Sequence, residues 1–291
     1  MAALNPLQDQ GAAKDHWTAE AYTVSASFVP ALANKILSWL APEEGDTILD
    51  LGCGDGILTA KIASQCTKTI GLDSSPNLVK AAEEKFTKGK EHRSNLEFQI
   101  RDCRKLETLI NEGTLRPESI SKIFSNAALH WILPHQDAEA RLSIFRGAYR
   151  VLRGNGICVF EMGGHGNVAE IHAVLLSALI HRGVSPAAAR AASPWFFPSQ
   201  DLMVQMLQSV GFRVERAETE YRPTKGTEGK EGGLEGWVRL MGAQILEMLE
   251  DEADREAAVR EICEVLESIC GRVEGGHWLG YVRLRILARK V

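Results

Sequence analysis

The chain of 291 residues carries a glycine-rich turn directly after a short apolar run. Residues 50–56 read DLGCGDG, and a helical stretch follows them. Glycines at such a place let a ligand approach the backbone closely, because any Cβ would occupy the ligand's space. The spacing is GxGxG: a dinucleotide fingerprint requires glycine where Ile57 stands, and a phosphate-binding loop requires a Gly-Lys-Ser/Thr that is missing. A nicotinamide oxidoreductase is therefore disfavoured, and a site for another small ligand is favoured.

Acidic residues follow the next two apolar runs. Asp73 stands 23 residues after Asp50, where a carboxylate can accept hydrogen bonds from both hydroxyls of a ribose. Asp102 and Cys103 follow the third run, where the carboxylate can accept from the exocyclic amine of an adenine and the amide can donate to a ring nitrogen. Taken singly, Asp73 is also an ordinary helix N-cap before Pro76, and Asp102 an ordinary loop acid. Their order along the chain favours one adenosine-like ligand.

Polar and aromatic groups meet after the fourth apolar run. Residues 125–131 read SNAALHW and contain Asn126 and His130. A hydroxyl or amine acceptor would need a base within hydrogen-bond reach, and His130 is the first candidate for a catalytic base, with His165 second. A histidine packed beside Trp131 without a catalytic role is the equally weighted alternative. A carboxylate acceptor would need no base.

Strands and helices alternate along the chain. Apolar runs of strand length lie at 47–51, 69–72, 96–100, 121–125, 157–160, 212–221 and 281–287, and helical patterns lie at 28–40, 58–63, 76–86, 138–152, 168–180 and 199–210. A turn is expected at 154–156, which reads GNG. This alternation predicts an α/β fold with an open, mostly parallel sheet, and such sheets bind ligands at the carboxyl ends of their strands.

Two segments interrupt this alternation, and we expect each to be a helical cap inserted into a single domain of residues 1–291. The core is expected at 20–165, the caps at 166–198 and 224–277, and the rest of the sheet at 199–223 and 278–291. Two amphipathic helices are expected in the second cap. The arginines near the caps could hold an acceptor carboxylate with two parallel hydrogen bonds, although surface arginines and core tryptophans are the commoner explanations. The candidate acceptor contacts are His165, Trp195, Arg222, Trp237 and Arg239.

The composition narrows the range of partners. Lysine and arginine number 33 against 38 acidic residues, a net charge of −5 without a long basic run, so we expect no nucleic acid partner. The six cysteines form no CxxC pair and no histidine stands at metal-ligand spacing, so a reduced protein without a metal is expected. The N-terminus does not read as a signal peptide, and no apolar stretch approaches the roughly 18 residues that span a bilayer. We therefore expect a cytoplasmic protein that acts on a small molecule and not at a membrane.

Five strings of the sequence, taken together, resemble a known family. ILDLGCGDG, GLDSSPNLVKAA, QIRDCRKL, SNAALHWI and VLRGNGICVF occur in the order of consecutive motifs of class I S-adenosylmethionine-dependent methyltransferases. LDSSP, SNAALHW and the Gly236-Trp237-Val238 of the second cap are most similar to the trans-aconitate methyltransferase group. The resemblance is specific over residues 20–165. Beyond them, only the order of the helices and strands is similar. The loop at 163–167 and the segment 195–197 depart from that group's pattern.

The resemblance implies a Rossmann-like sheet of seven strands, the last of them antiparallel, and S-adenosyl-L-methionine as the cofactor. It also implies a place for each polar group at the strand ends. The cofactor-binding residues are then Gly52, Gly54 and Asn126 around the methionine part, Asp73 at the ribose, Asp102 and Cys103 at the adenine, Ser74 next to Asp73, Asp50 ahead of the turn, and Trp17 and Tyr22 closing over from the N-terminal segment.

The activity that the resemblance implies is methyl transfer to a small-molecule acceptor. O-methylation of a carboxylic acid is the first expectation. Methylation of a hydroxyl, thiol or carbon of a secondary metabolite is one alternative, and a non-catalytic scaffold that binds the cofactor is another.

Overall fold

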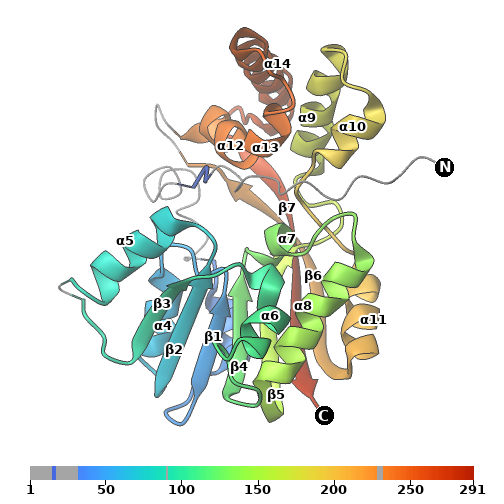
Figure 1. The fold of residues 1–291 in the computed structure, drawn as a ribbon. Helices are drawn as coiled ribbons and strands as arrows, with labels where there is room; N and C mark the ends of the chain where they lie inside the picture. Colours follow the sequence, from blue (N-terminus) through green and yellow to red (C-terminus); the bar gives the residue numbers. More distant parts are fainter. Residues whose placement is uncertain (1–14, 18–31, 90, 228–231) are drawn as a thin grey trace.

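The computed structural model describes residues 15–17, 32–89, 91–227 and 232–291. Within them, one sheet of seven strands runs in the order β3-β2-β1-β4-β5-β7-β6. The strand β7 is antiparallel to both of its neighbours, and the other neighbouring pairs are parallel. The strands are β1 (Thr47–Leu51), β2 (Lys68–Asp73), β3 (Leu96–Ile100), β4 (Ile120–Asn126), β5 (Leu152–Gly163), β6 (Phe212–Lys225) and β7 (Trp278–Lys290). The open, mostly parallel sheet with an antiparallel last strand is thus confirmed (Figure 1).

Helices connect the strands and begin at recognisable capping residues. The Ser75 side chain accepts a hydrogen bond from the Leu78 amide at the start of α5, and Ser199 and Asp251 cap α11 and α14 in the same way. None of the described helices is long and apolar enough to cross a membrane. The helices are α3 (Asn34–Leu40), α4 (Ile57–Ala63), α5 (Pro76–Phe86), the short η1 (Cys103–Lys105), α6 (Leu106–Asn111), α7 (Leu129–Ile132), α8 (Ala138–Val151), α9 (Ala169–His181), α10 (Pro186–Ala191), α11 (Gln200–Val210), α12 (Gly233–Met241), α13 (Ala243–Leu246) and α14 (Glu252–Cys270).

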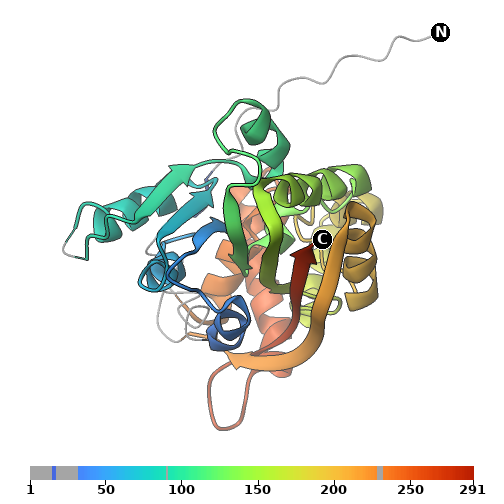
Figure 2. The ribbon, with the colours of Figure 1, turned by 90° about the horizontal axis from the view of Figure 1, so that it is seen from below.

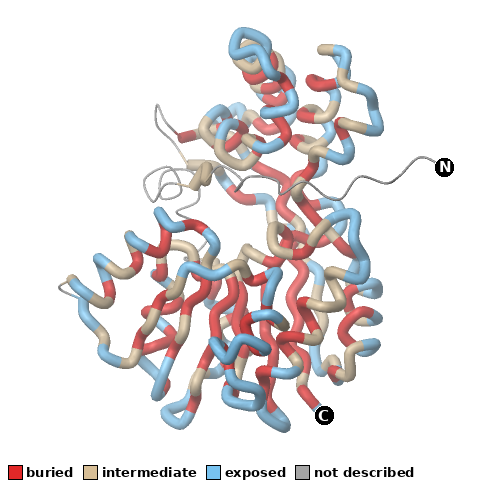
Figure 3. The backbone as a smooth tube through the Cα atoms, in the orientation of Figure 1, coloured by how far each residue is buried: buried red, intermediate tan, exposed pale blue. Residues whose placement is uncertain are grey.

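Helices cover both faces of the sheet, and successive side chains of each strand point to opposite faces, so a strand packs against helices on both sides. On β4, Ile123 packs in the hydrophobic cluster that α6, α8 and α11 cover, whereas its neighbour Phe124 packs with side chains of α3 and α4. On β5, Phe160 and Val159 divide in the same way. Figure 2 shows helices on both sides of the sheet, and Figure 3 shows that the central strands are largely buried, whereas the edge strand β6 is more exposed.

Five helices, α9, α10 and α12–α14, gather beyond the carboxyl ends of the central strands (Figure 1). They enclose a hydrophobic cluster of their own, in which Leu175 of α9 meets Trp237 of α12 and Ile262 of α14. Trp195, from the segment before α11, and Tyr281 of β7 join this cluster. Aromatic side chains are thereby placed beside the strand ends, while the division of the chain into core and caps stays a prediction.

Three features differ from the sequence-based expectations. The expected turn at 154–156 lies inside the bounds of β5, as a break in its pairing with β4: Leu152 pairs with Ile120 and Ile157 with Lys122, and Asn155 has a φ of +62°. The first amphipathic helix of the second cap is split into α12 and α13 at Gly242, where a Cβ would come within 3.0 Å of Leu175. The helices α6, α7 and α10 were not expected, because four to six residues are too few to show a helical period.

Candidate active site

The glycine turn between β1 and α4 is held against the end of β2. The Gly52 amide donates to the Leu72 carbonyl at 2.8 Å, and its φ of +75° is one that other residues rarely adopt. A Cβ on Gly52 would come within 2.3 Å of the Ala128 Cβ, so this glycine lets the turn pack against the segment that follows β4. Gly54, with a φ of +55°, has open space where its Cβ would stand. A ligand can therefore approach the backbone at Gly54.

Asp73, at the end of β2, fastens the turn from the other side. Its Oδ2 accepts a hydrogen bond from the Gly54 amide and its Oδ1 accepts one from the Ser75 amide, both at 2.9 Å. Burial raises the pKa of this carboxyl, and the two amide donors oppose that rise. Each carboxylate oxygen has a further lone pair, so Asp73 can still accept hydrogen bonds from the hydroxyls of a ligand. Ser74, next along the chain, is exposed.

The ends of β3 and β4 bring further polar groups to the same edge of the sheet. Asp102 precedes η1 and accepts a hydrogen bond from the Arg104 amide at 3.0 Å, and Cys103 is buried next to it. Asn126 ends β4, and its Oδ1 is buried without a hydrogen-bond partner among the described residues. A buried acceptor without a donor costs free energy, so this oxygen is suited to accept a hydrogen bond from a ligand.

Residues 15–17 connect this edge to an aromatic cluster. The Ser75 hydroxyl donates to Asp15 at 2.8 Å, and the Asn77 side chain donates to the Trp17 carbonyl at 3.1 Å. The Trp17 ring meets the Trp131 ring edge-on, with 5.3 Å between their centroids. The structure thus brings Trp17 beside the strand ends, while Tyr22 lies outside the described residues.

An aromatic pocket opens beside the end of β4. It is lined by Trp17, Ala127, His130, Trp131, Asn167, Val168, Trp195, Phe197, Trp237, Met241, Tyr281 and Arg283. The Trp195 ring lies 5.7 Å from that of Trp131 and 5.8 Å from that of Phe197. The Trp237 ring lies 6.2 Å from that of Trp195, and its indole N–H donates to the Tyr281 hydroxyl at 2.7 Å. Two of the expected acceptor contacts, Trp195 and Trp237, therefore meet in one pocket.

His130 lines this pocket, and its environment suits a hydrogen-bond donor better than the expected base. Burial, together with the charge of Arg283, lowers the pKa of its ring to about 3. Its Nδ1 accepts a hydrogen bond from the Gly163 amide at 3.3 Å, which leaves the proton on Nε2. A catalytic base works best when its pKa lies near the working pH, and that of His130 lies far below neutrality.

Three expected acceptor contacts lie outside the lining of the pocket. His165 is exposed on the loop after β5. Arg239 is held on the second cap by Glu235 and Glu256, with its nitrogens 2.8 and 2.7 Å from their oxygens. Arg222 of β6 donates to a buried glutamate of β5 at 3.1 Å. Acidic neighbours in space, which the sequence does not reveal, engage both arginines, and the structure does not bring these three residues together with the tryptophans.

Arg283 of β7 is a pocket residue that was not expected from the sequence. It is 3% exposed, and its Cζ lies 4.4 Å from the centre of the Tyr281 ring. Because side chains alternate along a strand, Tyr281, Arg283 and Arg285 share one face of the sheet. Two arginines on one face of a strand that lies between two others are unusual, since a buried charge needs a partner. That pattern was the signal that could have identified Arg283.

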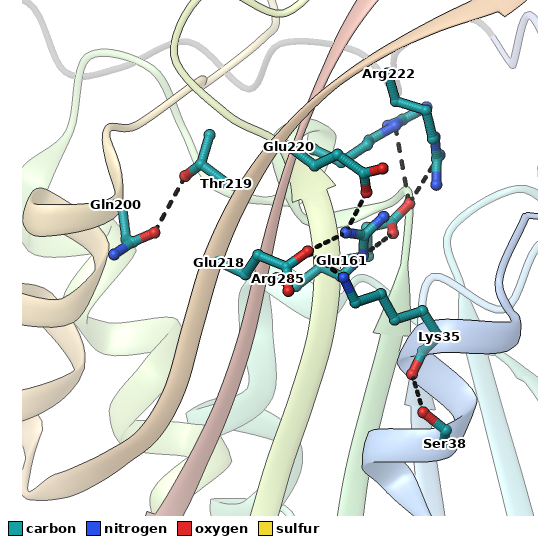
Figure 4. Close-up of polar contacts among 10 residues, drawn as sticks. Lys35, Ser38, Glu161, Gln200, Glu218, Thr219, Glu220, Arg222 and Arg285 are labelled. Carbon is teal, nitrogen blue, oxygen red and sulfur yellow. Dashed lines mark hydrogen bonds and ion pairs between the residues drawn. The ribbon is translucent and has the colours of Figure 1, made fainter.

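Glu161, near the end of β5, forms ion pairs with three arginines. Its Oε2 accepts a hydrogen bond from Arg285 at 2.6 Å, and its Oε1 accepts one from Arg222 at 3.1 Å. The Nε of Arg283 lies 3.8 Å from Oε1. Glu161 and Arg285 face each other directly across β5 and β7. The cluster is completed by Glu218 and Glu220 of β6, which both bind Arg285, and by Lys35 of α3, which pairs with Glu218 (Figure 4).

Comparison with known proteins decides the family. Residues 42–182 match the family described as a methyltransferase domain. The chain is 34% identical over 279 residues to an uncharacterized methyltransferase of Schizosaccharomyces pombe, and the match covers 95% of this chain and 99% of that protein. The chain belongs to the S-adenosylmethionine-dependent methyltransferases.

Two further matches describe this methyltransferase more broadly. It is 24% identical over 176 residues to the trans-aconitate 2-methyltransferase of an Enterobacter species, and the match covers 60% of each chain. The structure of a putative methyltransferase from Bacillus halodurans superposes with a TM-score of 0.59 at 15% identity, covering 89% of this chain and 99% of that one. The second match confirms the Rossmann-like fold, whereas the first spans too little of either protein to show the subgroup.

The strand ends of the methyltransferase fit its cofactor, S-adenosylmethionine. The open space beside Gly54 is one that a Cβ would fill, so a ligand can occupy it. The buried Oδ1 of Asn126 suits the ammonium group of a methionine, which is a donor only. Asp73 keeps lone pairs that suit the two hydroxyls of a ribose. The assignment of each residue to a part of the cofactor is a proposal that rests on these features.

Asp50 of the methyltransferase turns inward from the glycine turn. Its carboxylate is buried and accepts a hydrogen bond from the Thr59 hydroxyl of α4 at 2.7 Å. Burial raises the pKa of Asp50 to about 7; the Thr59 hydrogen bond opposes this rise, and the charge of Asp73 adds to it. Asp50, which the resemblance implies as a cofactor-binding residue, thus joins the turn to α4.

Asp50→Asn should stabilise the methyltransferase increasingly as the pH rises. An unfolded aspartate has a pKa of about 3.9, so folded Asp50 binds its proton more tightly. The stability that it contributes is complete below about pH 4 and is lost as the pH rises through about 7. Asparagine avoids that loss and still offers Thr59 an acceptor. The difference in unfolding free energy between variant and wild type should rise by about 1–4 kcal/mol from pH 5 to pH 8.

Asp46→Asn is the matched control. Asp46 is also buried, which raises its pKa, but hydrogen bonds from Lys122, Ser121 and the Glu43 amide, together with the charge of Lys122, lower the pKa below its usual value, so the carboxyl stays ionised from pH 5 to pH 8. This variant should be destabilised by the same amount at both pH values. A pH-independent difference for Asp50→Asn as well would contradict the raised pKa of Asp50.

Proposed function

We propose that this methyltransferase methylates a carboxylate oxygen of a small acid. One observation carries the proposal: the aromatic pocket holds a buried arginine, Arg283, and none of its described lining residues is suited to take up a proton. A carboxylate is already ionised at neutral pH, so it needs no base. A hydroxyl or an ammonium acceptor would need one.

Besides Arg283, two of the described lining residues can ionise, and neither is suited to be a base. The pKa of His130 lies at about 3, and its Nδ1 is engaged by the Gly163 amide. Burial raises the pKa of the Tyr281 phenol, which therefore stays protonated at neutral pH. Both side chains can donate a hydrogen bond to a carboxylate. This supports an acceptor that arrives already ionised.

The residues at the strand ends would orient the cofactor toward this pocket, with Asp73 at the ribose, Asp102 and Cys103 at the adenine and Asn126 at the methionine part. When bound, S-adenosylmethionine supplies an electrophilic methyl group: the acceptor oxygen forms the new bond to carbon, the electron pair of the broken carbon–sulfur bond stays on sulfur, and no proton is released. Holding two reactants in line and away from water can supply about 7–11 kcal/mol of the barrier. The buried pocket walls and strand-end loops are suited to that task.

The acceptor class has further support. The relative named trans-aconitate 2-methyltransferase bears the name of a carboxylic acid. This match supports an acid as the acceptor and a relationship of this chain to the trans-aconitate methyltransferase group. The net charge of −5 and the aromatic lining of the pocket support a small molecule over a nucleic acid.

Formation of a methyl ester tests the proposal. The protein is incubated with S-adenosylmethionine and a panel of small acids, each beside its matched alcohol and amine. An acid should gain the mass of one CH₂, and its alcohol and amine counterparts should not. Mild alkali should remove the added group, because esters hydrolyse whereas ethers and methylamines do not. Transfer to an alcohol, an amine or an RNA fragment, with every acid unchanged, would refute the proposal.

A further inference from the structure

The walls of the aromatic pocket are formed by flat, apolar rings. The rings belong to Trp17, Trp131, Trp195, Phe197, Trp237 and Tyr281. Trp195 and Phe197 are stacked with 24° between their planes, and Trp131 meets Trp195 edge-on at 76°. Covering such surfaces with an apolar body is favourable by about 25 cal/mol per Å² removed from water. The pocket is therefore suited to a hydrocarbon or aromatic body.

Arg283 is the one formally charged side chain among the described residues that line this pocket. It lies over the Tyr281 ring, close enough to His130 for its charge to affect that ring. No aspartate or glutamate is among those lining residues. Aromatic walls alone would also suit a cationic ligand, but Arg283 would repel one. A single carboxylate, in contrast, would be attracted and could be held by two parallel hydrogen bonds.

A second or third carboxylate on the acceptor would find no second cationic side chain among the described residues that line the pocket. Arg222 and Arg285, which bind Glu161 and, for Arg285, two glutamates of β6, are not among those lining residues. Placing an ionised carboxylate against apolar walls without a partner costs several kcal/mol. The pocket therefore disfavours polyacids as well as cations.

We infer that the acceptor is a monocarboxylic acid with an apolar or aromatic body, and that Arg283 is the residue that selects it; this inference rests on the proposed function. The carboxylate pairs with the Arg283 guanidinium, and the body lies among the rings of Trp195, Phe197 and Trp237. Methylation removes the charge of the acceptor, so the ester loses its ion pair with Arg283. The product should therefore bind more weakly than the acid, which favours its release.

Calorimetric titration in the presence of S-adenosylhomocysteine tests the acceptor class on the unaltered protein. The probes are two apolar monoacids, 3-phenylpropionate and decanoate; 3-phenylpropylamine, which resembles the first but is cationic; and trans-aconitate, a triacid. At least one monoacid should bind at least tenfold more tightly than both the amine and the triacid. Tighter binding of the amine or the triacid, or no binding of either monoacid, would overturn the inference.

Substitutions on β7 test the selecting residue. Arg283→Gln should weaken binding of the monoacid at least tenfold and reduce its preference over the amine. Arg283→Lys should keep part of that preference, because it keeps the charge. If Arg283→Gln does not fold, the ratio of the affinities of Arg283→Lys for the monoacid and for the amine tests the role of Arg283 instead: a ratio equal to that of the unaltered protein would overturn it. Arg289→Gln is the control, since Arg289 pairs with Glu215 outside the pocket lining. Unchanged acid binding in a folded Arg283→Gln would overturn the role of Arg283.

Binding and turnover together separate this inference from the proposed function. Binding of a monoacid with no methyl ester formed from any acid would refute the proposed function and leave the binding preference intact. Methylation of trans-aconitate with no reaction of either monoacid would support carboxylate methylation and overturn the inference.

Discussion

Gly54→Ala should weaken S-adenosylmethionine binding at least tenfold, which is about 1.4 kcal/mol or more, while the protein stays folded. A Cβ at this position would have no atom of the described residues within 4 Å apart from its chain neighbours, so the new methyl group would not clash with them. It would instead stand where the turn admits the cofactor. Calorimetric titration with S-adenosylmethionine measures the loss of affinity. The φ of +55° adds a strain of about 1–2 kcal/mol, which should lower the unfolding midpoint slightly.

Gly113→Ala is the matched variant. Gly113 also has a positive φ, +78°, and also has open space at its Cβ, but it lies between α6 and β4, at the amino end of the sheet. The two variants should lose similar stability, and only Gly54→Ala should lose affinity for the cofactor. Equal affinities of the two variants for S-adenosylmethionine would show that the glycine turn does not contact the cofactor.

Glu161→Gln should lower the free energy of unfolding by about 3 kcal/mol. Removing one partner of a buried ion pair costs about 3–5 kcal/mol, because the other charge is left buried. Arg285 keeps Glu218 and Glu220 as partners, so the lower end of that range is expected. Denaturant unfolding followed by circular dichroism measures the change.

Glu215→Gln provides the surface counterpart. Glu215 also pairs with an arginine of β7, Arg289, at 2.7 Å, but its side chain is 28% exposed. Exposed pairs contribute about 0–1 kcal/mol, so this variant should lose less than 1 kcal/mol. A loss at Glu161 no larger than that at Glu215 would show that the buried cluster does not stabilise the junction of β5, β6 and β7.

Much of the fold could be predicted because local signals fix where elements begin and end. The bounds expected for β1 and β3 match those observed, since a glycine turn ends the first and Arg101-Asp102 follows the second. Helix α5 also matches, because Ser75 caps it and Pro76 opens it. The antiparallel β7 was expected at 281–287 but runs further, from Trp278 to Lys290, since Gly280 interrupts the apolar run at one end and Arg289-Lys290 end it at the other.

Only part of the acceptor side could be predicted, because the contacts of its arginines depend on pairing between distant parts of the chain. Arginines look alike in a sequence, yet Arg222 binds Glu161, 61 residues away, and Arg239 binds Glu256, 17 residues away. Arg283 lines the pocket only because β7 returns between β5 and β6. The chemistry of His130 likewise depends on burial, which its sequence neighbours do not determine.

A crystal structure of the methyltransferase with S-adenosylhomocysteine tests most directly whether the strand ends and the aromatic pocket form one active site. The ribose hydroxyls should lie on Asp73, the amino group of the homocysteine should lie near Asn126, and the sulfur should be directed at the pocket that Trp195 and Arg283 line. A nucleoside bound in another cavity, or a sulfur directed away from that pocket, would show that the two do not form one active site.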